Sequence, residues 1–276
     1  MKALIALIVV LVSSADAFAF EAEVFPHEIS PGDAFLVKVC ATAGPPEKIQ
    51  SEGGSLTPLS PSGDGCYIAI GAVGLNTKPG DYEVSVKSAG EVKTLQFAVR
   101  KVSFPEISLS LPPEKVFLSP EDQKRAVREQ ERLSLIWEEV SGRLWEGGFI
   151  QPVENDVLTA FGVKRIINKE KVSIHWGIDI RGKEGEPVRA ANSGRAVFEE
   201  LLFFGGNTLI IDHGMGVYTI YMHLSGRNVE IGEPVSRGDI VGFVGSTGRA
   251  TGPHLHFGVK VGGLSINPLS LIGLLP

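Results

Sequence analysis

The chain has 276 residues, of which 43% are hydrophobic and 21% are charged. This composition is that of an ordinary globular protein, and the length suggests about two domains. A formal net charge of −6 provides no basic surface of the kind that nucleic-acid binding requires, so no nucleic-acid partner is expected. The 33 glycines and 17 prolines favour many short strands joined by tight turns.

The N-terminal residues are typical of a secretory signal. Lys2 precedes the apolar run Ala3–Val12, and small residues that suit a cleavage site follow it. The run is too short to span a bilayer as a stable helix, which favours a cleaved signal peptide at residues 1–19 over an uncleaved anchor. We therefore expect an exported protein, periplasmic or extracellular, with no transmembrane segment after cleavage.

Residues 20–103 alternate short β-rich runs with turn clusters. The clusters include "SPGD", "AGPPE" and "KPGD", whose glycines and prolines are strong turn formers. The β-rich runs are Ala34–Val39, Cys66–Ile70, Tyr82–Val86 and Lys93–Val99. Strands at this spacing predict a small antiparallel β-sandwich, and no catalytic combination of residues occurs within it.

The two cysteines of the chain, Cys40 and Cys66, both lie in this region. In an oxidising compartment, cysteines on neighbouring strand-like segments can form a disulfide. Two free cysteines would also suit small, buried, apolar positions. Both interpretations stay open, because the sequence does not show whether the two Cβ atoms face each other.

Residues 104–148 are interpreted as a linker that contains one helix. Ser119, followed by Pro120 and two acidic residues, is typical of a helix N-terminus. Apolar residues follow at helical spacing, with Trp137 beside them: Leu133, Ile136, Val140 and Leu144. We expect a helix that packs on one of the domains and ends before Gly147.

Residues 149–276 are again rich in glycine and β-forming residues and predict a second antiparallel β domain. Its stretch "TGPHLHF" carries His254 and His256 at alternate positions. Alternate residues of a strand lie on one face, so the two imidazoles are well placed for a single metal ion. Exposed strand histidines need no metal, however, so this pair alone does not establish a metal site.

A second cluster, "HWGID", places His175 four residues before Asp179. In a straight strand these two side chains would share a face but lie about 13 Å apart, too far for one ion. The glycine and the β-branched residues around it disfavour a helix. The chain must therefore bend between them, and Gly177 permits the bend.

Together these residues suit catalytic zinc, which usually takes three protein ligands and leaves one position for water. His175, Asp179 and one histidine of the His-x-His pair supply such a set. The remaining histidine of that pair and His223, in "YMHL", could then transfer protons. Strand alternation does not say which histidine of the pair touches the metal.

These segments resemble the motifs of a known family. "HWGIDI", "YMHL" and "GRATGPHLHF" resemble, in the same order, the H-x-x-x-D, lone His and H-x-H motifs of lysostaphin-type (LytM-like) zinc endopeptidases. The stretches "FGGNTLIIDHG" and "GEPV" are similar to the family too. Those enzymes cleave peptides of bacterial cell-wall peptidoglycan. The resemblance covers residues 149–272, and a weaker one extends to the sandwich and helix.

The resemblance implies that His175, Asp179 and His256 bind one Zn²⁺ per chain and that His223 and His254 are the catalytic pair. It also implies a mainly β protein whose C-terminal catalytic domain has a groove. The expected function is that of a secreted metalloendopeptidase associated with the cell wall. It would hydrolyse cross-links or stem peptides of peptidoglycan by attack of a zinc-activated water.

A second class of function stays open, namely a non-catalytic wall-binding or regulatory module that retains the peptidase fold. Such a module would be expected to have lost or displaced some ligands, whereas all five site residues are present. The sequence does not identify a regulatory protein partner.

Two further residues, Tyr221 and His213, are candidate substrate contacts. By strand alternation Tyr221 would share a face with His223 and line the cleft, or its ring would pack against the sheet. His213 follows a strand in "DHGMG" and is either a turn residue or part of the site. Arg249 would either meet a carboxylate of the wall peptide or be a solvated loop charge.

Overall fold

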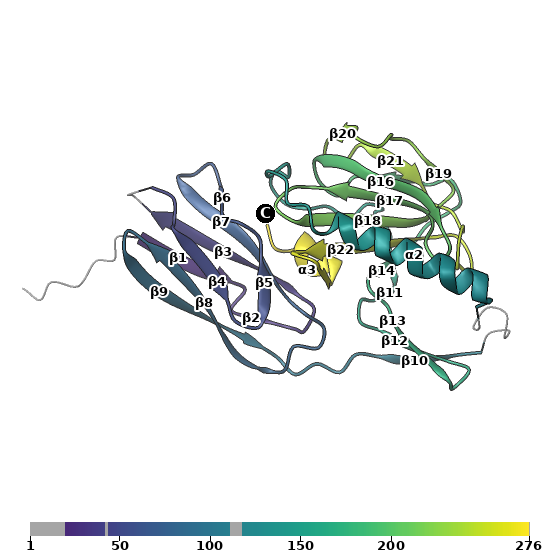
Figure 1. Cartoon of the computed structure of the whole chain (residues 1–276), viewed down its shortest axis with the longest axis horizontal. Helices are drawn as coiled ribbons and strands as arrows, with labels where there is room; N and C mark the ends of the chain where they lie inside the picture. The colour runs from purple at the N-terminus through teal and green to yellow at the C-terminus, as the bar shows by residue number, and fades with distance from the viewer. Residues whose placement is uncertain (1–19, 42–43, 111–117, 276) are drawn as a thin grey trace, which may run out of the picture.

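The structure is a computed structural model that describes residues 20–41, 44–110 and 118–275 (Figure 1). The predicted signal peptide at residues 1–19 lies outside the described residues. Within the described ranges, no helix is both long enough and apolar enough to cross a membrane. Strands in mainly antiparallel sheets dominate the chain, so the predicted fold class is confirmed.

The N-terminal strands form two facing sheets. The first has the order β1-β3-β7-β5, with β6 paired to β7, and the second has the order β2-β9-β8-β4. All pairs are antiparallel except β2 with β9. The strands are β1 (Phe20–Phe25), β2 (Glu28–Ile29), β3 (Ala34–Ala41), β4 (Lys48–Ser51), β5 (Gly54–Leu56), β6 (Ser60–Pro61), β7 (Cys66–Val73), β8 (Gly80–Ser88) and β9 (Glu91–Val99).

An apolar core holds the two sheets together. Phe35 of β3 and Phe97 of β9 stack across the space between the sheets, with ring centroids 4.6 Å apart. Phe35, Val37 and Val39 alternate along β3 and are fully buried, as period-2 patterning requires. This packing is that of a sandwich, in agreement with the alternation seen in the sequence.

Cys40 and Cys66 are joined by a disulfide. They face each other directly in the antiparallel register of β3 with β7, so their Cα atoms lie 4.2 Å apart. Neither residue is fully buried. Of the two interpretations, the disulfide is therefore confirmed, and the pair of buried free cysteines is not.

The predicted linker contributes a strand, which the sequence analysis did not anticipate. Strand β10 (Glu106–Leu109) pairs in parallel with β12 (Lys164–Ile167), and β12 pairs with β13 (Lys171–Ile174). The boundaries of the domains at residues 103 and 148 stay a proposal, because the linker is itself part of this sheet.

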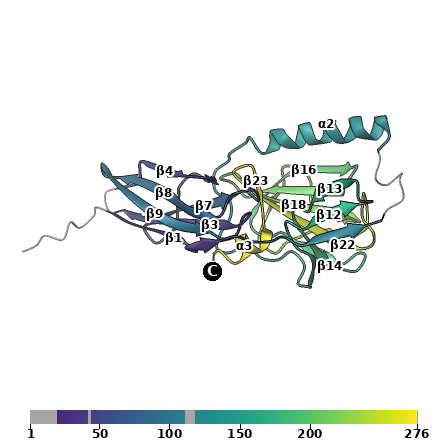
Figure 2. The same cartoon turned by 90° about the horizontal axis from the view of Figure 1, so that it is seen from below.

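Helix α2 (Pro120–Ile136) begins as predicted. The Ser119 hydroxyl accepts a hydrogen bond from the backbone N–H of Asp122 at 3.0 Å, and Pro120 occupies the first turn. The helix lies along the outer side of the large sheet that the C-terminal strands form (Figure 2). Leu133, Ile136 and Trp137 pack there against an apolar cluster of that sheet: Phe198, Leu202, Ile210, Tyr218 and Ile220.

The helix ends at Ile136, so the prediction that it continues through Val140 and Leu144 was wrong. Residues 141–145 instead bond to the turn that contains His213. The backbone N–H groups of Leu144 and Trp145 both donate to the His213 carbonyl, at 2.8 and 3.1 Å. These tertiary bonds replace the bonds of a continued helix, and Val140 is left exposed.

The C-terminal strands form one large antiparallel sheet and a smaller one. The large sheet has the order β11-β14-β22-β18-β17-β16-β20, with β23 paired to β22, and the small one has the order β15-β21-β19. The strands of the large sheet are β11 (Val157–Thr159), β14 (Ile178–Arg181), β16 (Gly194–Leu202), β17 (Gly206–Asp212), β18 (Val217–Leu224), β20 (Pro234–Val235), β22 (His254–Val261) and β23 (Leu264–Ile266). Those of the small sheet are β15 (Pro187–Arg189), β19 (Gly226–Arg227) and β21 (Ile240–Phe243).

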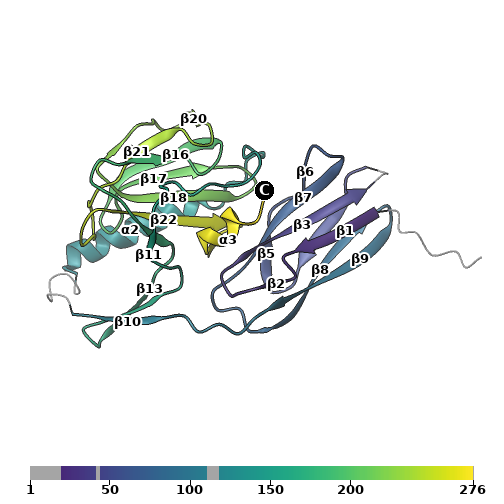
Figure 3. The same ribbon diagram turned by 180° about the vertical axis from the view of Figure 1, so that it is seen from behind.

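The sandwich and the C-terminal sheets share an apolar core. Ile68, Ile70 and Ala72 of β7 belong to the same buried cluster as the interior of the large sheet. The short helix α3 (Pro268–Ile272) lies between the two halves (Figures 1 and 3). Just before it, the Asn267 backbone N–H donates to the Gly32 carbonyl at 2.7 Å. These contacts hold the sandwich against the C-terminal sheets.

Breaking the Cys40–Cys66 disulfide is expected to lower the free energy of unfolding by about 3 kcal/mol. The cross-link joins residues that are 26 positions apart, and its loss returns conformational entropy to the unfolded chain. Urea unfolding of the protein, with and without a phosphine reductant, measures this change. A Cys40→Ser/Cys66→Ser variant is the control and should respond to urea identically in both conditions. An unchanged midpoint for the reduced native protein would contradict the expectation.

Candidate metal centre

Three adjacent strands bring the predicted site residues together. Strand β22 lies between β14 and β18 in the large sheet. In the antiparallel register, His256 of β22 lies directly opposite Asp179 of β14 on one side and Met222 of β18 on the other. Residues that are 77 positions apart in the sequence, Asp179 and His256, are therefore neighbours.

His175 reaches this point through a bend in the chain. It lies after the end of β13 and before β14, and its backbone is held by bonds to Val163 and Gly162 at 3.0 and 2.9 Å. The predicted bend between His175 and Asp179 is therefore present.

Gly177 is needed for a different reason from the one expected. Its φ is not in the left-handed region, so the bend does not require glycine. A Cβ atom at this position would instead lie 2.5 Å from the Phe257 carbonyl oxygen and 2.8 Å from Nε2 of His256. Glycine is therefore required because the backbone passes directly against the His256 ring.

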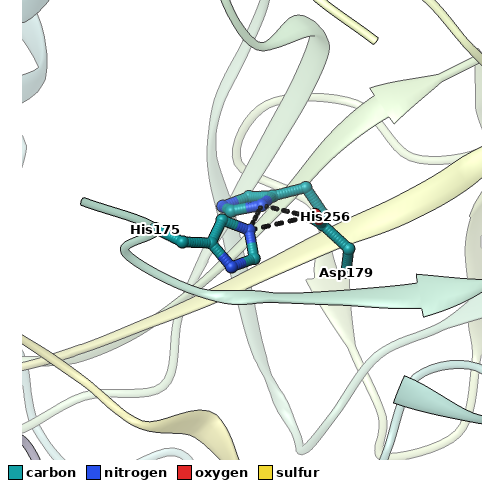
Figure 4. Close-up of side chains that lie close together, drawn as sticks. All are labelled: His175, Asp179 and His256. Carbon is teal, nitrogen blue, oxygen red and sulfur yellow. Dashed lines mark hydrogen bonds and ion pairs between the residues drawn. The ribbon is translucent and has the colours of Figure 1, made fainter. Parts of the chain in front are cut away.

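Three electron-pair donors converge at this site (Figure 4). Nε2 of His175 lies 2.8 Å from Oδ1 of Asp179 and 3.0 Å from Nδ1 of His256, and this Nδ1 lies 2.8 Å from the same Oδ1. His175 and Asp179 are buried, and His256 is partly exposed. The open side of the cluster is therefore the side of His256.

The hydrogen bonds of His175 indicate that a cation belongs among these atoms. Its Nδ1 lies 2.9 Å from the Ala160 carbonyl oxygen, which can only accept, so Nδ1 carries the proton. In the neutral ring Nε2 then has a lone pair, and this lone pair faces the Asp179 carboxylate. Two nitrogens and one oxygen at this spacing fit zinc, whose tetrahedral ligands lie roughly 3.3 Å apart.

Arg165 completes the surroundings of Asp179. Burial opposes the charged form of the Asp179 carboxyl, but its contacts with His175 and His256 outweigh burial, and its pKa lies well below the usual range. Nη2 of Arg165, on β12, lies 2.9 Å from Oδ2 of Asp179. Oδ1 is thereby left for the metal cluster. Arg165 could not be predicted from the sequence, because no motif connects β12 with Asp179.

His223 and His254 lie beside the cluster with matching tautomers. Nδ1 of His223 lies 2.8 Å from the Thr247 carbonyl oxygen, and Nδ1 of His254 lies 2.8 Å from the Gly252 carbonyl oxygen. Each Nδ1 therefore carries a proton, and in the neutral ring each Nε2 is free to accept one. The two ring centroids are 4.9 Å apart, and Nε2 of His254 lies 3.7 Å from Oδ1 of Asp179.

The expectation that Tyr221 shares a face with His223 was wrong. His223 has a left-handed φ of 65°, which is uncommon for a residue other than glycine and breaks the alternation of the strand. Tyr221 pairs with Phe257 on the core side, whereas Met222 lies opposite His256. The unusual backbone at His223 therefore turns its ring toward the metal cluster.

Tyr221 and His213 are both fully buried, which does not favour the substrate contacts predicted for them. They belong to a buried hydrogen-bond chain with Thr219. Nδ1 of His213 donates to the Ser193 carbonyl, its Nε2 lies 2.7 Å from Oγ1 of Thr219, and that hydroxyl lies 3.0 Å from the Tyr221 hydroxyl. Burial lowers the pKa of His213 to about 4, so the ring is neutral and its role is structural.

Arg249 is an exposed loop residue that stacks on an aromatic ring. Its guanidinium lies 4.3 Å from the ring centroid of Phe204, and its backbone N–H donates to the Phe204 carbonyl. The ring and the backbone bond hold the loop beside Thr247, whose carbonyl orients His223. The structure shows no acidic partner for Arg249 among the described residues.

Comparison with known proteins agrees with this site. Residues 173–268 match the model of peptidase family M23. Over 128 residues, 46% of this chain, the sequence is 40% identical to DD-carboxypeptidase/endopeptidase Mpg of Neisseria meningitidis, of which it covers 30%. It is 39% identical over 100 residues to peptidoglycan DD-endopeptidase ShyA of Vibrio cholerae, which is 36% of this chain and 23% of ShyA. The chain thus spans less than a third of the length of these relatives.

One solved structure is similar over most of the chain. It is from Pseudomonas aeruginosa and carries the name of peptidase M23, with 28% sequence identity and a TM-score of 0.67. The similarity covers 88% of this chain and 95% of that chain. It therefore extends beyond the residues that match the family model and includes part of the region before them.

Removing the charge of Arg165 is expected to weaken metal binding. An Arg165→Gln variant loses the charged partner of Oδ2, and loss of such an outer partner typically costs about 10–100-fold in metal affinity. Competition for Zn²⁺ with a chromogenic chelator measures the change. Arg181→Gln is the matched control, because Arg181 follows Asp179 on β14 and forms only an exposed pair with Asp156. Equal affinities in the two variants would contradict this role for Arg165.

Proposed function

We propose, since residues 173–268 form a peptidase family M23 domain, that the protein is a zinc metalloendopeptidase that hydrolyses cross-links or stem peptides of bacterial peptidoglycan. One observation carries the proposal. Two histidines that are not in the ligand cluster, His223 and His254, lie beside the three converging donors with Nε2 free. A structural metal site would need the donors but not this pair.

The substrate class rests on the relatives. The similar proteins from Neisseria and Vibrio are named as endopeptidases, and the second is named for peptidoglycan. Residues 173–268, which match the family model, contain all five proposed site residues. Export to the periplasm or the cell surface is part of the proposal, because peptidoglycan lies outside the cytoplasm.

His175, Asp179 and His256 would hold one zinc ion per chain. When bound, zinc supplies a Lewis acid for the scissile carbonyl and a nucleophilic water at neutral pH. Arg165 holds the Asp179 carboxylate in place. The carbonyl of Ala160 fixes the His175 tautomer, so that Nε2 keeps its lone pair.

His223 and His254 would move the protons of the reaction. Burial lowers the pKa of His223 to about 4, so its ring is neutral at pH 7 and accepts a proton at Nε2. His254 is hydrogen-bonded at Nδ1 in the same way, and its Nε2 lies on the side of Asp179. A ring that accepts a proton from the attacking water at Nε2 becomes an imidazolium, and it can then stabilise the developing oxyanion or pass that proton to the leaving amine.

A non-catalytic wall-binding or regulatory module is the other class considered. Such a module has no need for two oriented histidines beside a complete ligand set. No feature of the described residues favours it over an enzyme.

Digestion of purified cross-linked peptidoglycan tests the proposal directly. We expect the protein to release peptide fragments with new amino and carboxyl termini, identified by mass spectrometry. Chelation should abolish the release, and added Zn²⁺ should restore it. Full activity in metal-free protein, or release of glycan fragments without peptide cleavage, would contradict the proposal.

The histidines should divide between metal binding and proton transfer. We expect His256→Ala to lose zinc on dialysis, because it removes one of three ligands. His223→Ala and His254→Ala should keep zinc but hydrolyse the substrate on the order of 10²–10⁴-fold more slowly. Zinc content and turnover measured in all three variants check the division. Zinc loss in His254→Ala with retention in His256→Ala would invert the assignment.

A further inference from the structure

A groove with a volume of about 970 Å³ runs from His256 toward the sandwich. Its floor is formed by the strands β22 and β18, with Gly258, Ile220 and Met222. One wall is the end of α2, and the far end is formed by the sandwich residues 53–55, which include the start of β5, and by the loop residues 74–77. Because His256 is a proposed metal ligand, this groove is contiguous with the proposed catalytic centre.

The groove has an unusual distribution of charge. Apart from His256, the only ionisable side chain among the described residues that line it is Lys260, and no aspartate or glutamate lines it. The other lining residues are apolar, small or amide and hydroxyl residues. A ligand that enters this groove therefore meets one ammonium group and no acidic group.

Lys260 lies on the same strand and the same face as His256. Both belong to β22, where residues at even positions from His254 onward lie on one face and Leu255, Phe257 and Val259 face the core. The four residues from His256 to Lys260 correspond to about 13 Å along the strand. An extended peptide that begins at the metal cluster would reach Lys260 after about four residues.

Lys260 is held in position but has no acidic partner. Its Nζ donates to the Gly263 carbonyl and to the Ser265 hydroxyl, both at 3.1 Å, and lies 5.2 Å from the ring centroid of Trp137. An ammonium has three N–H donors, so one remains for a ligand. No carboxylate of the described residues forms an ion pair with Lys260.

Burial lowers the pKa of the Lys260 ammonium, and no nearby acid raises it again. A bound anion would supply the missing counter-charge. The position of the group, between Trp137 of α2 and the turn at Gly263, leaves the groove as the direction from which such an anion can come.

We infer that Lys260 binds a carboxylate of the substrate peptide, about four residues from the bond that is cleaved. This inference rests on the proposed peptidase function and adds a specificity determinant to it. Trp137 and Leu133 of α2, and the half-exposed Trp176, provide apolar walls for the intervening peptide. Specificity would thus depend on α2 and the sandwich, which complete the groove around Lys260.

Two matched peptides test the inference. One is a synthetic cross-linked peptide of the peptidoglycan type with free carboxylates on both sides of the cleaved bond, and the other carries primary amides at the same positions. We expect the protein to hydrolyse both, with a KM on the order of 10–100-fold lower for the carboxylate peptide. The kcat values should be similar, because Lys260 is remote from the reacting atoms.

Lys260→Met should abolish this preference. The methionine keeps an apolar stem against Trp137, so KM for the carboxylate peptide should rise to that of the amide peptide, with little change for the latter. Lys260→Arg keeps the charge and should retain most of the preference. Lys48→Met removes one exposed charge on β4, outside the groove, and should behave as the unmodified protein does.

The outcomes separate the inference from the function that it rests on. If the unmodified protein hydrolyses both peptides with equal KM, the peptidase function stands and the carboxylate site is overturned. If Lys260→Met loses activity equally on both peptides, its role is structural, and the inference is again overturned. If the unmodified protein hydrolyses neither peptide and also does not digest peptidoglycan, the proposed function itself fails, and the inference fails with it.

Discussion

The convergence of three electron-pair donors is the constraint on which the C-terminal half depends. His175, Asp179 and His256 hold their donor atoms 2.8–3.0 Å apart, a spacing that requires either a proton on Nδ1 of His256 or a cation among them. The fold holds these atoms in place through three kinds of contact. Strand β22 is fixed between two partners, Arg165 neutralises the far side of the carboxylate, and Gly177 allows the backbone to pass against the His256 ring. A bound cation would replace that proton and pair with the lone pairs that the fold brings together.

Much of the site was predictable from residue types and spacing, since a His-x-His pair on a strand needs only alternation to share a face. The parts that were not predictable arise where the backbone departs from its regular form. The left-handed backbone at His223 breaks the alternation of β18, so its side chain lies on the face opposite to the one that regular alternation predicts. The prediction that Tyr221 shares a face with His223 was wrong for this reason. Arg165 meets Asp179 only through the pairing of sheets. Helix α2 ends early because tertiary bonds to His213 compete with it, and these bonds have no local signal.

The two halves of the molecule are less separate than the sequence suggested. The sandwich strand β7 shares a buried apolar cluster with the large sheet, and sandwich residues 53–55 and 74–77 close one end of the groove that begins at His256. Helix α2 packs on the large sheet and presents Trp137 to the same groove. The segments that precede residues 173–268 therefore contribute surface to the region where a substrate would lie, and they pack directly against the C-terminal sheets.

Strand β10 restricts insertions and deletions in the segment that joins the two halves of the chain. Loops that join domains ordinarily tolerate insertions, because the cost of a longer loop grows slowly. Residues 106–109, however, are hydrogen-bonded in register with the strand that carries Arg165. One residue added within β10 would shift or interrupt this pairing and separate Glu106 from its ion-pair partner Lys164 on the same strand as Arg165. Insertions and deletions should therefore be excluded from this short stretch, although it joins two halves that resemble separate domains.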